Sequence, residues 1–329
     1  MTGHALGHTG DVQTPEVTAR SGGTIGPLRS TVVVNPARVQ QLAELREVVD
    51  AALAAAGWPA PDWLETTADD PGTGQARRAV QAGAEVVFVS GGDGTVRAAL
   101  AGLAGSAVAL AVLPAGTGNL LATNLGLPID PVEGVRVAVA GGRRQVDLGE
   151  MDGELFAVMA GMGFDAAVMD STSATLKARI GPLAYVISAV PHLFGRPMRV
   201  QVTVDDQSAL RRHARAVLVG NVGRLQGGVV LLPDAEPDNG RMDVAILAPR
   251  TLAHWAALAF AVLLRRQRVP RMEVIRGSRI TISSDREQPR ELDGDVIAAA
   301  RTLQVTVRPS ALWLCVPQPD SSPDLAEGS

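Results

Sequence analysis

The sequence predicts an α/β protein of two domains, a doubly wound α/β domain followed by a mainly antiparallel β-sandwich domain. In the first half of the chain, short apolar runs alternate with apolar positions at helical spacing, and each run ends in a loop of small and polar residues. After about residue 149, the runs shorten and alternate apolar with polar residues, as antiparallel strands do. A length of 329 residues suits roughly two domains.

The first predicted strand covers residues 31–34 and ends in Asn35-Pro36. Apolar residues then recur with helical spacing between 42 and 53, which predicts a helix there. A second strand begins at residue 86 and breaks at a glycine-rich turn, from which a helix is expected to start at Val96.

The third predicted strand, at residues 109–113, leads into the loop 114–119 and a helical stretch from Leu120. The order is therefore strand, helix, strand, helix, strand, helix. That order implies a right-handed doubly wound unit, in which the loops at the carboxyl ends of the strands gather around one crevice.

The turn Gly91-Gly92-Asp93-Gly94-Thr95 suits a phosphate. Glycines without a Cβ allow positive φ and a close approach of phosphate to backbone N–H groups, next to the positive end of the following helix. The carboxylate of Asp93 would repel that phosphate unless a divalent cation lay between them, which indicates metal-nucleotide chemistry. An ordinary strand-to-helix turn uses the same residue types, so this loop alone does not decide the question. The second glycine loop, at 114–119, favours the phosphate-binding interpretation.

Alternating strands are expected through the second half of the chain, and a sandwich beside the first domain would leave a cleft for a substrate. The predicted strands are 198–204, 214–219, 242–247, 278–282 and 303–307. The predicted organisation is a disordered tail at 1–29, an α/β domain at 30–148, a sandwich at 149–302 and a second tail at 317–329.

Composition limits the function classes. A net charge of only −4 argues against a general nucleic-acid-binding protein, so no nucleic-acid partner is expected. Cys315 is the single cysteine, which excludes an intrachain disulfide, and we expect it to pack as a small core residue. The first 29 residues lack the pattern of a signal peptide, which favours a cytoplasmic protein.

The three loops after the predicted strands resemble the catalytic domain of the diacylglycerol kinase and sphingosine kinase family, especially its soluble bacterial lipid kinases. The resemblance covers about residues 31–316 and implies that a last segment at 303–316 returns to complete the first, nucleotide-binding domain. Four further segments follow in the order of the family: 161–166, Lys177 with 181–185, 233–244, and 291–295.

This resemblance implies an ATP- and Mg²⁺-dependent lipid kinase that transfers the γ-phosphate to a hydroxyl of diacylglycerol or a related lipid. A sphingoid-base or phosphatidylglycerol kinase is an alternative, because acyl-chain pockets use interchangeable apolar residues. An NAD kinase shares the Gly-Gly-Asp-Gly-Thr loop, but its Asn-x-Gly-x-Leu-Gly-Phe segment is missing here. A non-catalytic regulator that binds lipid or nucleotide is the remaining alternative.

The resemblance also implies which residues bind the nucleotide. Arg97 and Ala98 stand where the family has Asn-Glu, so Arg97 contacts a phosphate or faces solvent, while Asn119 binds the nucleotide or braces its loop. Thr66 and Thr67 are adjacent, and the alignment does not choose between them. The full set is Asn35, Thr66, Thr67, Gly91, Gly92, Asp93, Gly94, Thr95, Val96, Arg97, Gly116, Thr117, Gly118 and Asn119.

Two catalytic residues are expected, Asp93 to hold the magnesium and Asp295 as proton acceptor. Asp295 takes the place of a family glutamate, and its side chain is one methylene shorter. The alternative to this catalytic role is that Asp293-Gly294 only forms a hairpin turn. The resemblance also implies a second, structural metal site in the segment 233–244. Neutral Asn239 stands where the family has aspartate, which weakens the expected binding of a metal ion. Its expected ligands are the side chains of Asp238 and Asn239 and the backbone carbonyls of Glu236 and Arg241.

Residues 251–268 form an amphipathic helical pattern that is too short to span a bilayer. Trp255 and the arginines that follow it in the sequence suit contact with an anionic membrane surface. A helix that only covers the core would show the same pattern. The arginines are Arg265, Arg266, Arg268 and Arg271. The expected partner is thus a membrane-resident lipid met by peripheral contact, and a homodimer is compatible with the family.

Overall fold

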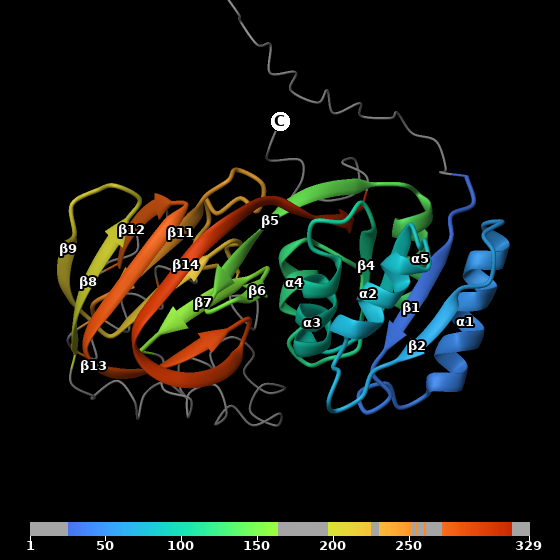
Figure 1. The fold of residues 1–329 in the computed structure, drawn as a ribbon, viewed down its shortest axis with the longest axis horizontal. Coiled ribbons are helices and arrows are strands. Elements are labelled where there is room, and N and C mark those ends of the chain that lie inside the picture. Colours follow the sequence, from blue (N-terminus) through green and yellow to red (C-terminus); the bar gives the residue numbers. More distant parts are fainter. Residues whose placement is uncertain are drawn as a thin grey trace, which may run out of the picture.

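The computed structural model describes residues 26–163, 197–224, 230–249 and 272–317, with residues 251, 254 and 260 in addition. The predicted motifs at 164–166, 177 and 181–185, and the four arginines from 265 to 271, lie outside the described residues. Two lobes lie side by side and are joined by long strands (Figure 1). The fold class predicted from the sequence is confirmed.

The first lobe has a parallel sheet with helices on both faces (Figure 1). Its strands are paired in the order β2-β1-β3-β4. They are β1 (Ser30–Val34), β2 (Asp62–Glu65), β3 (Val86–Gly91) and β4 (Ala109–Pro114). Its helices are α1 (Leu42–Ala55), α2 (Thr73–Gln81), α3 (Asp93–Leu103), α4 (Leu120–Asn124) and α5 (Pro131–Val139).

The helices divide between the two faces of the parallel sheet. Buried residues of α1 and α5 share one apolar cluster with β1, β3 and β4, and those of α2, α3 and α4 share another. The chain adds β2 on one side of β1 and then returns to add β3 on the other side. The direction of winding therefore reverses between β1 and β3, the place where open α/β sheets bind their ligands.

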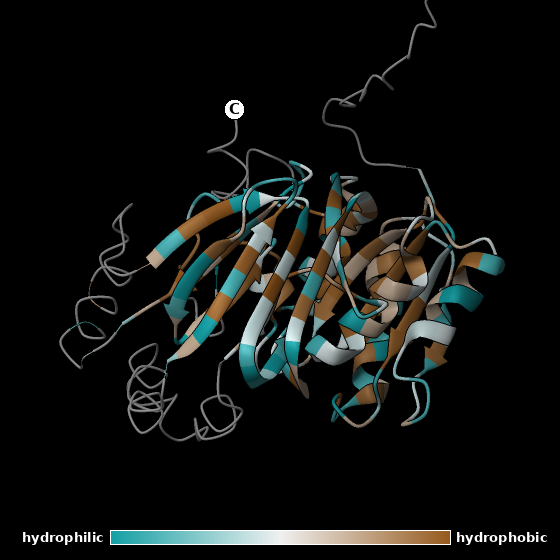
Figure 2. Ribbon diagram, turned by 60° about the vertical axis from the view of Figure 1, so that its left-hand side comes forward, coloured by the Kyte–Doolittle hydropathy of each residue, from teal (hydrophilic) through white to brown (hydrophobic). Residues whose placement is uncertain are grey.

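The second lobe is antiparallel (Figure 1). It contains β5 (Arg143–Met151), β6 (Glu154–Phe156), β7 (Met159–Met162), β8 (Met198–Val204), β9 (Leu210–Ala214), β10 (Ala216–Gly220), β11 (Met242–Leu247), β12 (Met272–Gly277), β13 (Arg279–Leu292) and β14 (Asp295–Cys315). Apolar and polar residues alternate along several of these strands, β8 among them, as brown bands between teal and white ones show (Figure 2), whereas β10 is buried at every position.

Strand β13 joins the two layers of the sandwich. Its first part pairs with β8, which pairs with β9, while its last three residues pair with β7, at the edge of the layer β7-β10-β11-β12. Register shifts between Ser283 and Arg290 allow the strand to change partners. The inward residues of both layers form one apolar core, to which β7, β8, β10, β11, β13 and β14 all contribute.

Strand β14 carries the chain back to the first lobe, and Figure 1 shows it running beside β5 from one lobe to the other. Its end is parallel to β4, with Trp313 opposite Ala109 and Leu314 opposite Leu110. Cys315 is buried there, as expected, and burial raises its pKa to about 11. Among the residues that the model describes, no helix is both long and apolar enough to span a bilayer.

Candidate functional site

The first glycine loop lies at the switch point, directly after β3. Helix α3 begins at Asp93, three residues earlier than expected, so the carboxylate stands in the first turn, where the helix dipole favours a negative charge. Gly91, Gly92 and Gly94 do not adopt the positive φ that glycine allows. Packing requires a glycine at position 91, because a Cβ there would lie 2.6 Å from the Cβ of Thr95.

The two glycine loops pack directly against each other. A Cβ on Gly116 would lie 2.7 Å from the Cα of Gly92, so only glycine allows this approach. The half-buried Asp93 joins the loops, since its Oδ1 accepts the N–H of Leu120 at 2.6 Å. Burial raises the pKa of Asp93, and backbone N–H groups of Leu120 and Asn119 oppose that rise.

Asn119 braces the second loop, which is one of its two predicted roles, and its binding of the nucleotide stays a prediction. Its Oδ1 accepts the N–H of Gly116 at 3.0 Å, and its Nδ2 donates to the carbonyl of the same residue at 2.9 Å. Asn119 itself adopts the left-handed conformation, at φ 47°. Thr117 and Gly118 form the turn between them, and the Thr117 side chain is exposed.

The loops after β1 and β2 reach the same edge of the sheet. Asn35 donates from Nδ2 to the hydroxyl of the buried Thr95 at 2.9 Å. This hydrogen bond connects the loop after β1 to the end of the first glycine loop. Thr66 is buried at the end of β2, whereas Thr67 is exposed and its hydroxyl accepts the N–H of Asp70. Of the two threonines, Thr67 is the one open to a ligand.

The sandwich contributes the hairpin between β13 and β14. Asp293 and Gly294 form its tight turn at φ 48° and 88°, as predicted for an Asp-Gly pair. The buried carboxylate of Asp293 accepts N–H groups of Ala157, Val158 and Met159 at 2.9 to 3.0 Å. Burial raises its pKa to about 6 despite these three hydrogen bonds.

A small cavity between the lobes joins both sides of the site. Its walls include Asp93 from the first glycine loop and Asp293 from the hairpin, together with apolar side chains of α3 and α4. The residues that line it are Asp93, Val96, Arg97, Leu100, Leu120, Leu121, Ala157, Val158 and Asp293. A larger pocket, at Pro197, His213, Ala214, Arg215, Ala248 and Pro249, includes no residue of either glycine loop.

Asp295 lies over the first turn of α3. Its Oδ2 is 3.4 Å from the position that a Cβ on Gly94 would occupy. Arg97 pairs with that Oδ2 through Nη2 at 2.8 Å and with Glu154 Oε2 through Nη1 at 2.9 Å. Neither predicted role of Arg97 describes this arrangement, in which the guanidinium bridges two carboxylates of the sandwich.

Three acidic residues near the site were not assigned from the sequence. Asp293 belongs to the quoted Asp-Gly motif, whose position between two strand-like runs was its signal. Glu291 is 4% exposed, and burial raises its pKa to about 8. No sequence signal distinguishes Glu154, which reaches Arg97 from β6.

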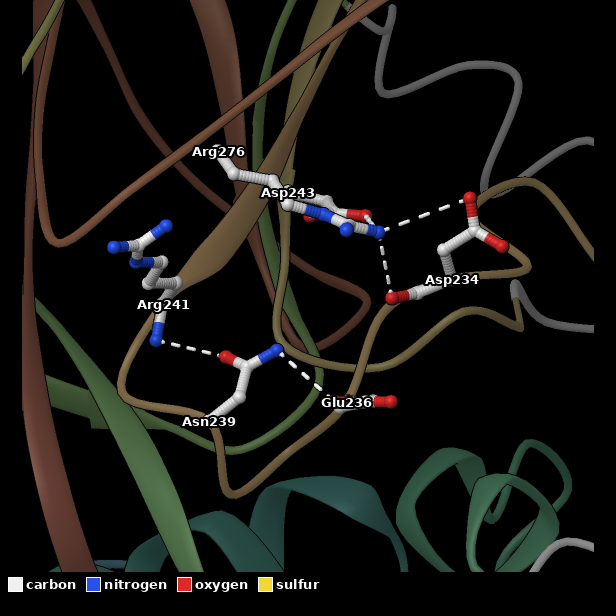
Figure 3. A network of polar contacts seen from close by, with 6 residues as sticks. All are labelled: Asp234, Glu236, Asn239, Arg241, Asp243 and Arg276. Carbon is white, nitrogen blue, oxygen red and sulfur yellow. Dashed lines mark hydrogen bonds and ion pairs between the residues drawn. The ribbon is translucent and has the colours of Figure 1, made fainter. Parts of the chain in front are cut away.

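The segment 233–244 holds arginine side chains where a structural metal was expected (Figure 3). Asp238 pairs with Arg144 Nε at 2.7 Å, and Asp243 pairs with Arg276 Nε at 2.5 Å. Arg276 also donates to the carbonyl of Asp234 at 2.8 Å.

Asn239 accepts the N–H of Arg241 at 2.9 Å and donates to Glu236 Oε2 at 3.4 Å, so its amide is engaged within the loop (Figure 3). Among the described residues, no group of three or more His, Cys, Asp or Glu is arranged to hold a metal ion. The carboxylates of Asp238 and Asp243 thus pair with guanidinium groups, and the metal roles of Glu236, Asp238, Asn239 and Arg241 stay a prediction.

The first glycine loop does fit a nucleotide and its metal. The first turn of α3 starts with backbone N–H groups that lack helical partners, and Asp93 supplies hard carboxylate oxygen beside them. Larger side chains at Gly91 and Gly116 would clash with Thr95 and Gly92 and disturb the packing of the two loops.

Comparison with known proteins gives consistent results along the chain. The diacylglycerol kinase catalytic domain matches residues 29–151, and the YegS C-terminal NAD kinase beta sandwich-like domain matches residues 157–316. The "Probable lipid kinase YegS-like" protein of Pseudomonas putida is 33% identical over 245 residues, which cover 73% of this chain and 79% of that protein. A diacylglycerol kinase of Staphylococcus carnosus is 28% identical over 81% of this chain and 88% of its own length.

Solved structures agree on the fold. A diacylglycerol kinase from Bacillus anthracis superimposes with a TM-score of 0.73 at 22% identity, covering 89% of this chain and 98% of that one. An NAD kinase from Archaeoglobus fulgidus, solved in complex with ATP, superimposes with a TM-score of 0.51 at 12% identity, over 91% of this chain and all of that one. The chain therefore belongs to the diacylglycerol kinase catalytic-domain family of lipid kinases, and it is a kinase.

Proposed function

We propose that this protein uses ATP and Mg²⁺ to phosphorylate a hydroxyl of diacylglycerol or a related lipid. The observation that carries the proposal is the convergence of two packed glycine loops with Asp93 and Asp295 at one crevice between the lobes. Phosphoryl transfer requires this combination of phosphate-binding backbone, a metal-binding carboxylate and a proton acceptor.

The two sides of the crevice have different tasks in this proposal. Backbone N–H groups of the first turn of α3 bind the phosphates, and Asp93 provides oxygen ligands for the metal. Bound magnesium would neutralise the charge that develops on the phosphoryl group. Asp295 accepts the proton of the acceptor hydroxyl, because it reaches the same turn of α3 from the sandwich side.

The acceptor is proposed to be a lipid because of the named relatives, which include lipid kinases and diacylglycerol kinases. We also propose that the enzyme meets this lipid by peripheral contact with the membrane. A sphingoid base or phosphatidylglycerol would suit the same chemistry, since each presents a hydroxyl at the bilayer surface.

NAD phosphorylation is the second candidate, favoured by the fold that this chain shares with the ATP-bound NAD kinase. The sequence argues against it, because the second loop reads Gly116-Thr117-Gly118-Asn119. A protein that binds nucleotide without transferring phosphate remains the non-catalytic alternative.

The deciding experiment incubates the protein with γ-³²P-labelled ATP and Mg²⁺ and offers separate acceptors: diacylglycerol, a sphingoid base, phosphatidylglycerol and NAD. We expect label in the diacylglycerol product and none in NADP. Label only in NADP would assign an NAD kinase, and binding of ATP with no labelled product from any acceptor would contradict the proposal in favour of a regulator. Omission of Mg²⁺ tests the metal requirement in the same assay.

A further inference from the structure

We propose that Arg97 is a positioning residue, which holds the carboxylate of Asp295 over the phosphate-binding turn of α3. This inference rests on the proposed function, because it assigns Arg97 a role through the proposed proton acceptor. Neither the sequence motif nor the family comparison gives Arg97 such a role, since the family has asparagine at this position.

The geometry of the guanidinium supports a holding role. Two of its nitrogens bind two different carboxylates, Asp295 at 2.8 Å and Glu154 at 2.9 Å. The Arg97 side chain is only 18% exposed, whereas those of Asp295 and Glu154 are 51% and 64% exposed. A largely buried guanidinium that binds two exposed carboxylates restricts their positions.

The location of the pair connects the two lobes. Arg97 lies one turn after Gly94 on α3, and the Asp295 carboxylate that it binds lies 3.4 Å from the place where a Cβ on Gly94 would stand. Asp295 begins β14, and Glu154 begins β6, so the guanidinium ties α3 to two strands of the sandwich. The first lobe thus sets the place of a carboxylate that belongs to the second.

The shorter side chain of Asp295 makes such support useful. Aspartate reaches one methylene less than the glutamate of the family, and proton transfer loses efficiency steeply when the acceptor is misplaced by about 1 Å. An arginine anchored on the same turn as the phosphate cradle would keep this short carboxylate within reach of an acceptor hydroxyl.

The competing interpretation is that Arg97 binds ATP phosphate directly. The two roles differ in what the loss of the guanidinium would change. A phosphate ligand contributes to ATP affinity, whereas a residue that places the proton acceptor contributes to kcat at saturating ATP.

The test compares Arg97→Gln and Arg97→Lys with the parent enzyme, with kcat measured on the lipid acceptor and the Kd for ATP measured by calorimetry. For Arg97→Gln we expect kcat to fall about tenfold or more while the Kd changes less than about twofold. Arg97→Lys should recover part of the kcat, since an ammonium group can still hold one carboxylate. Arg212→Gln is the matched control, because Arg212 forms an ion pair with Glu273 on the sandwich surface.

A kcat of Arg97→Gln within about twofold of the parent would overturn the inference, as would an ATP affinity that falls in proportion to kcat. Thermal unfolding of each variant detects a general loss of folding. If Arg97→Gln is unstable, the comparison is made with Arg97→Lys, provided that its melting temperature equals that of the parent. Asp295→Asn tests the proposed proton acceptor separately from the role of Arg97. If that variant keeps the parental kcat, the proposed proton acceptor is wrong, independently of the result at Arg97.

Discussion

Asp93 combines a structural contact with a proposed chemical role, and a single substitution can separate them. Its Oδ1 accepts the N–H of Leu120, and an asparagine oxygen can accept the same hydrogen bond without the charge. We therefore expect Asp93→Asn to keep the parental melting temperature and to lose about 10²-fold or more in turnover. Asp93→Ala should lose both, because the N–H of Leu120 would then lack this acceptor. Turnover of Asp93→Asn within about tenfold of the parent would remove its charge from the mechanism.

Glu291 should make the stability of the protein depend on pH. Burial raises its pKa from 4.5 to about 8, so the folded protein keeps this proton over a range in which the unfolded chain has lost it. The unfolded state then binds fewer protons, and the contribution of Glu291 to stability is largest below pH 4.5 and falls as the pH rises to about 8.

Replacement by glutamine removes this ionisation. We expect Glu291→Gln to be more stable than the parent at pH 8, on the order of a few kcal/mol at most, and to show little difference at pH 5. Urea unfolding at the two pH values measures the effect, and the exposed Glu287→Gln is the control. An equal difference at both pH values would show that packing, rather than ionisation, causes the change.

At the scale of elements, the segment 233–244 gives a prediction about metal dependence. Its carboxylates pair with Arg144 and Arg276, and the N–H of Gly240 donates to the buried Asp147 at 2.6 Å. We expect Mg²⁺ or EDTA to change the melting temperature of the ATP-free protein by less than about 1 °C, because no bound ion would stabilise the loop. Arg144→Gln should lower stability by about 1 kcal/mol or less, as is usual for a partly exposed ion pair.

A magnesium-dependent rise of several degrees would contradict this account of the loop, and thermal unfolding with increasing Mg²⁺ measures it directly. Ca²⁺ at the same concentration controls for general ionic effects. If Asp93→Asn abolishes such a rise, the ion binds at the glycine loop instead of at Asp238 and its neighbours.

The elements that the sequence predicted are those with continuous apolar runs or helical spacing. Strands β1, β3 and β4 and helix α1 belong to this group. Strand β2 was missed because its four residues, Asp62 to Glu65, carry a charge at each end and are only partly buried. Helix α2 was missed because its buried face consists of Gln75, Ala76 and Ala79, which give a weak apolar signal.

At the scale of the whole molecule, the site depends on contacts that no local pattern contains. The motifs predicted the two glycine loops and the Asp-Gly turn, each as a separate segment. The bridge from Arg97 to Asp295 spans 198 residues of sequence, and the anchoring of Asp293 by the 157–159 backbone spans about 135. The first contact follows from the placement of the lobes by β5 and β14, and the second follows from the pairing of β13 with β7. Neither partner was available to a motif-based argument.

If the acceptor is a membrane lipid, as proposed, the whole enzyme has to reach it at the bilayer surface. An acyl-chain lipid stays in the bilayer, so a peripheral kinase needs a surface that binds headgroups. If the arginines of the 251–271 stretch provide it, each contributes on the order of 1 kcal/mol to binding of anionic vesicles, and salt weakens that binding. The residues concerned are Arg265, Arg266, Arg268 and Arg271.

Replacement of all four arginines by glutamine should reduce sedimentation with phosphatidylglycerol vesicles and lower turnover of vesicle-borne diacylglycerol. Activity on a soluble short-chain diacylglycerol should persist, because the glycine loops and the Asp295 hairpin lie on other segments of the chain. A parent enzyme whose vesicle binding is insensitive to salt would argue against an electrostatic contact. If the quadruple variant binds vesicles as well as the parent does, the stretch acts as a core-covering helix and another surface meets the lipid.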